Sequence, residues 1–179
     1  MRCGFEVASY EPDPFHLAIL KQTLKLNKIE TVAVIAAAVS NRRGEAEFVR
    51  LKGNTTGSHL AGAKPNPYGE IDRFMVNLVP ASDIIGRFDL VKIDAEGHEA
   101  PIILDTRTQD WTHTDAIVEI GSRENAASIF DHCNRLGLQI FTQKTGWRGA
   151  RAPSDLPTSY REGSAFITRR EIIPGIKSG

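Results

Sequence analysis

The stretch FEVASYEPDPFHLAILKQTLKLN, residues 5–27, decides the fold class because it contains a strand followed at once by a helix. The apolar segment FEVASY, residues 5–10, has the composition of a strand and runs into Glu11. Asp13 is then a good N-cap, and Pro14 suits the first position of a helix. Leucines recur at helical spacing from there, so we predict an amphipathic helix over residues 14–26.

Three further segments extend this unit. The nearly continuous apolar segment TVAVIAAAVS, residues 31–40, has the length of a strand covered on both faces, and we expect it to lie beside strand 5–10 in a parallel sheet. The segment GEAEFVRL, residues 44–51, alternates small or apolar with polar residues, which predicts an exposed strand or hairpin arm. Residues 52–72 are rich in Gly, Pro and Asn without periodicity, which predicts a long loop.

Strands and helices alternate through most of the remaining chain. Strands are expected at residues 74–80, 88–94, 115–121, 138–143 and 164–170. Helical segments are expected at 82–85, capped by Ser82, after Glu99 as far as about Leu104, and at 124–137. A second long loop, rich in Gly, Pro and Arg, spans residues 144–163. This order predicts an α/β fold with a mainly parallel sheet, and 179 residues favour a single domain.

The composition of the chain argues against several classes of function. The chain carries 22 basic and 22 acidic side chains, so no net charge attracts nucleic acid or an anionic membrane. Cys3 and Cys133 have no metal-like spacing to the five histidines, which predicts reduced thiols and no metal site. No run of about 18 apolar residues and no signal-peptide core occur, so we expect no membrane span and a cytoplasmic location.

Candidate functional residues follow the strands, because ligands of open α/β sheets bind outside the carboxyl ends of the strands. Glu11 follows the first strand, where a carboxylate can accept hydrogen bonds from the hydroxyls of a ribose. The alternative for Glu11 is a surface acid that precedes a helix cap. The Ala38-Val39-Ser40 segment ends the second strand, and KIDAEGHE, residues 92–99, ends a later one.

The KIDAEGHE segment concentrates charge around a turn. It contains Lys92, Asp94, Glu96 and Glu99, with His98 between the last two acids and Gly97 to ease the turn. Such a cluster can bind a cofactor amine, orient a hydroxyl group or take up its proton. The alternative is a solvated turn whose acids favour the N-terminus of the next helix.

Four motifs together resemble one family. In order, ASYEPDPFHLAILKQTLKLN, AAAVSNRRGEAEF, GNTTGSH and FDLVKIDAEGHE look like motifs of the FkbM-type methyltransferases, which use S-adenosylmethionine and usually methylate a hydroxyl. The similarity runs from about Val7 to Leu104, and KIDAEGHE is its most specific motif. The resemblance implies a Rossmann-like class I methyltransferase fold with a mainly parallel sheet.

The resemblance also implies roles for individual residues. Glu11 would bind the ribose of the cofactor, with Pro12 beside it, and Asp94 would lie near the methionine end. Ala37, Ala38 and Val39 would line the adenine pocket. The family suggests no general catalytic base, so the candidates Glu96, His98 and Glu99 rest on chemistry alone.

One part of the family pattern is not found in these residues. The first strand of the family ends in a glycine-rich loop, and nothing before Glu11 fits it, so we expect the first strand–helix unit to be absent from this chain. That strand lies between the strands that end at Glu11 and Asp94, so its loss leaves two open sheet edges. We therefore expect weak cofactor binding by residues 1–179, and a homo-oligomer if a second copy pairs with the open edge.

The resemblance thus implies O-methylation of a hydroxyl on a small molecule or sugar. The alternative is a non-catalytic α/β interaction module derived from a methyltransferase. A Rossmann-type oxidoreductase is disfavoured because no G-x-G-x-x-G follows a strand. The acceptor is expected to bind the two long loops. Their candidate contacts are Lys52, Lys64, Tyr68, Lys144, Trp147, Arg148, Arg151 and Tyr160.

Overall fold

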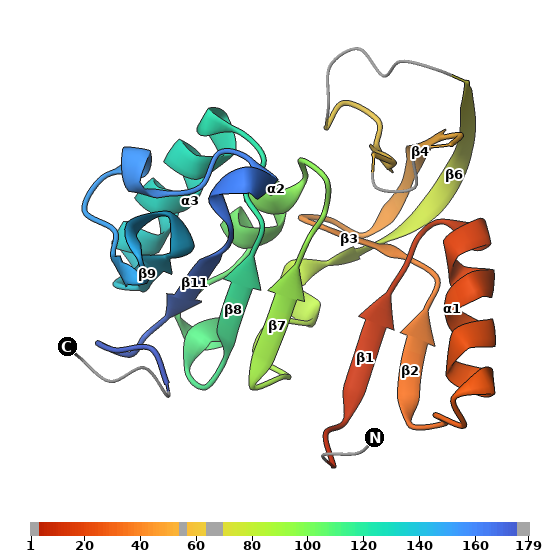
Figure 1. Cartoon of the computed structure of the whole chain (residues 1–179), viewed down its shortest axis with the longest axis horizontal. Coiled ribbons are helices and arrows are strands. Elements are labelled where there is room, and N and C mark those ends of the chain that lie inside the picture. Colours follow the sequence, from red (N-terminus) through yellow and green to blue (C-terminus); the bar gives the residue numbers. More distant parts are fainter. Residues whose placement is uncertain (1–3, 54–56, 64–69, 175–179) are drawn as a thin grey trace. The chain divides into compact units, whose positions relative to one another are not determined.

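The computed structural model describes residues 4–53, 57–63 and 70–174. The chain forms two compact units, Met1–Val79 and Pro80–Gly179 (Figure 1). Both contain strands and helices, so the fold is mixed α/β with several sheets. In the described ranges, no helix has both the length and the apolar character needed to cross a membrane.

The first unit opens with a parallel strand pair and its helix. Strand β1 (Val7–Tyr10) pairs with β2 (Val32–Ile35), and helix α1 (Pro14–Leu26) connects them. The predicted cap is confirmed, because the Asp13 side chain accepts the Phe15 N–H at 2.8 Å. Local sequence therefore determines both ends of this helix, with Asn27 as its C-cap.

The segment predicted as one strand over residues 31–40 is in fact two short strands in different sheets. After β2 the Ala37 N–H donates to the Ile35 carbonyl at 3.0 Å, and the chain turns into β3 (Ala38–Ser40). Strand β3 joins the second sheet of the unit, in the order β3-β6-β4-β5. The prediction of a single strand was wrong because small Ala38 is buried in the core of that second sheet.

The second sheet is built on a long antiparallel pair. Strand β4 (Gly44–Leu51) pairs along its whole length with β6 (Ile71–Pro80), and β5 (His59–Leu60) pairs with β4 in the antiparallel sense. The strand predicted at 44–51 is therefore confirmed. The loop predicted at 52–72 contains β5 and the start of β6, and residues 54–56 and 64–69 lie outside the described ranges.

The second unit contains a five-stranded sheet. Its strands are β7 (Leu90–Ile93), β8 (Asp115–Val118), β9 (Gln139–Thr142), β10 (Arg148–Gly149) and β11 (Ala165–Thr168), in the spatial order β10-β9-β11-β8-β7. Strands β7 and β8 are parallel, whereas β11 is antiparallel to both β8 and β9. Strands β7, β8 and β9 therefore point in the same direction.

The expected mainly parallel sheet is thus not confirmed. Besides β11, strand β10 is antiparallel to β9, and the four-stranded sheet of the first unit contains the antiparallel pairs of β4. The reason lies in the connections, since parallel neighbours need a long crossover whereas antiparallel neighbours do not. Between β9 and β11 the chain forms only short elements, η3 (Gln143–Thr145), β10, η4 (Pro153–Asp155) and η5 (Tyr160–Glu162).

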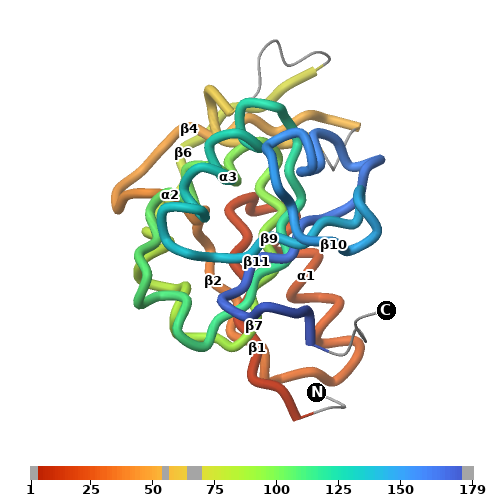
Figure 2. Tube along the Cα trace, turned by 90° about the vertical axis from the view of Figure 1, so that its left-hand side faces the viewer, coloured from red at the N-terminus to blue at the C-terminus, as the bar shows by residue number. Residues whose placement is uncertain are grey.

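Two helices of the second unit pack together. Helix α2 (Glu99–Leu104) contacts α3 (Arg123–Leu136), and α3 also contacts β9 (Figure 2). Ser122 caps α3 by accepting the Asn125 N–H at 3.1 Å, and Gly137, at φ 69°, ends it. The predicted helix at 124–137 is therefore confirmed within one residue at each end. A short helix, η2 (Thr108–Trp111), precedes β8.

The cap predicted at Ser82 is wrong. The short helix η1 (Ala81–Asp83) begins one residue earlier, with Pro80 in the N-cap position. Ser82 instead donates its backbone N–H to the Asp105 carboxylate at 2.8 Å. The start of this short helix is therefore influenced by a hydrogen bond to Asp105, 23 residues away. No local sequence pattern indicates such a contact.

Two strands are sheet edges in the described part of the chain. Strand β1 pairs with β2 alone, and β7 pairs with β8 alone. These are the strands that end at Glu11 and Asp94, and they belong to different units.

Candidate functional site

Two carboxylates at neighbouring strand ends share one lysine in the second unit. Asp94 follows β7 and Glu119 follows β8, and the Glu119 N–H donates to the Ile93 carbonyl at 3.0 Å. The Lys92 Nζ lies 2.9 Å from Asp94 Oδ2 and 3.1 Å from Glu119 Oε1. Burial alone would lower the pKa of Lys92, but its hydrogen bonds to the two acids raise it. The ammonium group therefore fixes both carboxylates at this sheet edge.

The turn after Asp94 has an unusual backbone. Glu96 has φ 51° and Gly97 has φ 102°, and a non-glycine residue rarely adopts such a conformation unless its surroundings hold it. The His98 N–H closes the turn on the Ala95 carbonyl at 3.2 Å. Burial lowers the pKa of His98, which favours the neutral imidazole at neutral pH.

Glu99 holds this turn from inside the protein. It is 2% exposed. Its Oε1 accepts the N–H groups of Ala95 and Gly97 at 3.1 and 2.9 Å. Its Oε2 accepts the side-chain amide of Asn125 at 3.0 Å, and the same amide donates to the Gly97 carbonyl at 3.1 Å. The catalytic role predicted for Glu99 stays a prediction, but its carboxylate has a clear structural role in shaping the turn.

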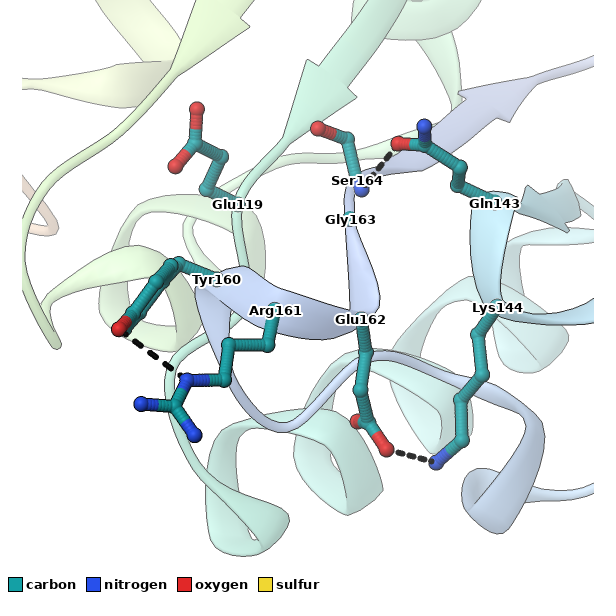
Figure 3. Close-up of a pocket in the computed structure, with 8 residues that line it drawn as sticks. All are labelled: Glu119, Gln143, Lys144, Tyr160, Arg161, Glu162, Gly163 and Ser164. Atoms are coloured by element: carbon teal, nitrogen blue, oxygen red, sulfur yellow. Dashed lines mark hydrogen bonds and ion pairs between the residues drawn. The ribbon is translucent and has the colours of Figure 1, made fainter.

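A polar pocket of about 650 Å³ lies at the ends of β8 and β9, where β11 begins (Figure 3). It is lined by Glu119, Gln143, Lys144, Tyr160, Arg161, Glu162, Gly163 and Ser164. The loop at 144–163, predicted to bind the acceptor, supplies five of these residues. Of the predicted contacts in this loop, Lys144 and Tyr160 line the pocket, while Trp147, Arg148 and Arg151 do not.

Internal bonds shape the pocket wall. Lys144 Nζ lies 3.1 Å from Glu162 Oε1, and the Thr158 N–H donates to Glu162 at 2.8 Å. These two partners lower the pKa of Glu162, with the backbone bond as the larger cause. Gly163 has φ 85°, and a Cβ there would lie 2.2 Å from the Gln143 side chain, so only glycine fits.

Glu11, which is predicted to bind the cofactor ribose, lies in the first unit. Its N–H donates to the Ile35 carbonyl at 3.0 Å, which holds it at the end of β1. Its Oε1 accepts the Asp13 N–H at 2.8 Å. Burial raises the pKa of Glu11, while the Asp13 hydrogen bond and His16 act in the opposite direction. Pro12 is half-buried between the two acids.

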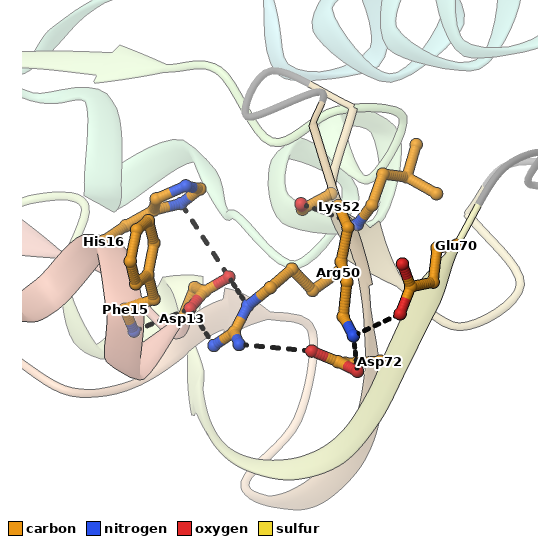
Figure 4. Close-up of polar contacts among 9 residues, drawn as sticks. Asp13, Phe15, His16, Arg50, Lys52, Glu70 and Asp72 are labelled. Atoms are coloured by element: carbon orange, nitrogen blue, oxygen red, sulfur yellow. Dashed lines mark hydrogen bonds and ion pairs between the residues drawn. The ribbon is translucent and has the colours of Figure 1, made fainter.

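A buried ion pair fixes the Glu11 loop (Figure 4). Asp13, fully buried, accepts two hydrogen bonds from the Arg50 guanidinium, one of them from Nε at 2.7 Å. The guanidinium also lies 4.8 Å from the Phe74 ring centroid and 3.6 Å from Asp72. Burial would raise the pKa of Asp13, but the Arg50 and Phe15 hydrogen bonds lower it. The loop after β1 is thereby attached to strands β4 and β6.

The three residues predicted to line an adenine pocket differ in accessibility. Ala37 and Ala38 are 3% and 6% exposed, and Ala38 packs in the core with Phe48 and Leu78. Val39 is half-buried. Little surface of the two alanines is therefore available to a ligand. Of the other predicted contacts, Lys52 is paired with Glu70 and Asp72, and Lys64 and Tyr68 lie outside the described residues.

Sequence reasoning missed three residues of this arrangement. Glu119 follows β8, so the rule of reading residues after strands would have found it. Arg50 lies within an alternating strand, and Asn125 lies in the first turn of a helix. Neither position carries a local signal, because their partners Asp13 and Glu99 are 37 and 26 residues away.

Comparison with known proteins identifies the family. The family model described as Methyltransferase FkbM domain matches residues 1–137, which include Glu11 and the whole KIDAEGHE segment. No significant match to a curated protein or to a solved structure was found. In the described ranges, no group of three or more His, Cys, Asp or Glu residues is arranged to hold a metal ion. The chain therefore belongs to the FkbM-domain methyltransferase family.

Proposed function

We propose that this protein is an S-adenosylmethionine-dependent methyltransferase that methylates a hydroxyl group of a small molecule or sugar. The observation that carries the proposal is the FkbM-domain match over residues 1–137. The positions of Glu11 and Asp94, each directly after a strand of a parallel pair, support it. Residues after such strands are those that contact ligands in α/β sheets.

The residues of the first unit suit the adenosine half of the cofactor. Glu11 has one carboxylate oxygen bonded to the Asp13 N–H, and within the described ranges no hydrogen bond engages the other. That oxygen can accept hydrogen bonds from ribose hydroxyls. The Asp13–Arg50 pair keeps the loop in place while Glu11 binds. Val39 offers the accessible apolar surface for the adenine.

The residues of the second unit suit the reacting half. Asp94, held by Lys92, is proposed to contact the methionine part of the cofactor. When bound, the cofactor supplies an electrophilic methyl group on a sulfonium. Glu96 and neutral His98 lie on the turn that follows Asp94 and can hold a proton from the acceptor. Glu99 keeps this turn in its conformation.

Calorimetric titration with S-adenosylhomocysteine tests this proposal. It compares the protein with its Glu11→Gln variant, which loses the charge of the carboxylate proposed to bind the ribose. Saturable binding that weakens in the variant supports the proposal, whereas a folded protein that does not bind favours the interaction module. Circular dichroism of both proteins provides the folding control.

A further inference from the structure

The polar pocket at the strand ends adjoins the proposed methyl-transfer site through one side chain. Glu119 lines the pocket and shares Lys92 with Asp94. We propose that this pocket binds a neutral, polyhydroxylated acceptor and that the Glu119 carboxylate contacts the hydroxyl that is methylated. Binding of the polyol rests on the pocket alone, and its role as acceptor rests on the proposed function.

The charges in the pocket favour a neutral ligand. The ionic side chains that line it are Glu119, Lys144, Arg161 and Glu162, two of each sign. Lys144 is paired with Glu162 at 3.1 Å, and Glu119 is paired with Lys92 at 3.1 Å. A charged ligand would have to compete with these pairs, whereas hydroxyl groups can bond to donors and acceptors of both signs.

The pocket also offers an aromatic surface. The Tyr160 side chain at the rim is 75% exposed, and its hydroxyl accepts a hydrogen bond from Arg161 Nε at 3.2 Å. An exposed tyrosine ring of this kind combines a flat apolar surface with a polar edge. It therefore suits a ring such as a pyranose, which has C–H groups on its face and hydroxyls around its rim.

Glu119 has the geometry to take the hydroxyl proton. Lys92 engages its Oε1, and no described residue makes a hydrogen bond to Oε2. In the proposed step the acceptor O–H proton passes to a Glu119 oxygen as the hydroxyl oxygen forms the new C–O bond. The C–S bond of the sulfonium donor breaks, and its electron pair stays on sulfur. Lys92 remains protonated and holds Glu119 in position.

Binding of simple glycosides to residues 1–179 tests the pocket without the cofactor. The probe is methyl β-D-glucopyranoside, titrated while the amide signals of Gly163 and Ser164 are followed by NMR. We expect saturable shifts of both signals. Glu119→Gln removes the carboxylate charge and should weaken binding about fivefold or more, because a charged acceptor makes the stronger hydrogen bond. Glu171→Gln, at an exposed position after β11, is the matched control and should bind as the parent protein does.

The outcomes separate the two proposals. No saturable shift, or unchanged binding in Glu119→Gln with an intact thermal melt, would overturn the pocket assignment. Binding of methyl glucuronide or methyl glucosaminide at least about tenfold tighter than the neutral glycoside would overturn its neutral character. Glycoside binding by a folded protein that does not bind S-adenosylhomocysteine would leave the polyol site standing and reject the methyltransferase role.

Discussion

The Glu99 carboxylate and the Asn125 side-chain amide meet at 3.0 Å, and Asn125 also reaches the Gly97 carbonyl at 3.1 Å. Glu99 thus joins the first turn of α3 to the turn that follows Asp94. With its other oxygen it accepts two backbone N–H groups of that turn. The two oxygens of Glu99 together accept three hydrogen bonds, which explains how an acidic side chain is accommodated in a buried position.

Replacing Glu99 should therefore destabilise the protein strongly. Glu99→Ala leaves two backbone N–H groups and the Asn125 amide without their acceptor, and we expect a loss of about 3 to 5 kcal/mol in the free energy of unfolding. Glu99→Gln keeps one acceptor oxygen and should lose about 1 to 2 kcal/mol. Urea denaturation measures both. The exposed Glu171→Gln variant should change by less than about 0.5 kcal/mol, and an equal loss there would contradict this role of Glu99.

Local sequence signals were enough to predict several of the helices and strands. Asp13, Pro14 and the leucine spacing specified α1, and Ser122 with Gly137 bounded α3. Each of these signals acts over a few residues, so a single sequence contains it. The strands that became β4 and β8 were also found from their patterns.

What the sequence could not reveal depends on contacts between distant segments. The break between β2 and β3 follows from burial of Ala38 in the second sheet, and the reversed β11 follows from a connection without a long helix. Glu11 and Asp94 were predicted as binding residues because they follow strands, and both do follow strands in the structure. Arg50 and Asn125 act on partners far along the chain, so no pattern indicated them.

The Asp13–Arg50 pair should make stability depend on pH. The pKa of Asp13 is lowered in the folded protein, so its contribution is present above the unfolded pKa of about 4 and is lost as the pH falls through the folded pKa. Asp13→Asn keeps a helix cap but removes the charge, and should cost about 2 to 4 kcal/mol at pH 7. Urea denaturation between pH 2 and 7 should show this difference shrinking below about pH 4. A difference that stays constant with pH would exclude a charged Asp13.

The buried thiol of Cys133 should be unreactive in the folded protein. Burial raises its pKa to about 12. In a Cys3→Ser background, which removes the cysteine outside the described residues, we expect reaction with Ellman's reagent at pH 8 only after denaturation. Rapid reaction under native conditions would show that the thiol is accessible.

The same thiol predicts a loss of stability at high pH. The unfolded thiol ionises above about pH 8.5 while the folded thiol keeps its proton, so the free energy of unfolding should fall by about 1.4 kcal/mol per pH unit between about pH 8.5 and 12 from this group. Cys133→Ala in the Cys3→Ser background should lack that component. Equal slopes in the two proteins above pH 9 would contradict the raised pKa.

The most direct test of the proposed methyltransferase is the affinity of the protein for S-adenosylhomocysteine, measured by calorimetry with and without Glu11→Gln. We predict weak but saturable binding by the parent protein and a loss of about tenfold or more in the Glu11→Gln variant, since hydrogen bonds to a charged group contribute about 1.5 to 3 kcal/mol. Unchanged affinity in that variant would remove Glu11 from the site. No binding by the folded parent protein would contradict the proposed function itself.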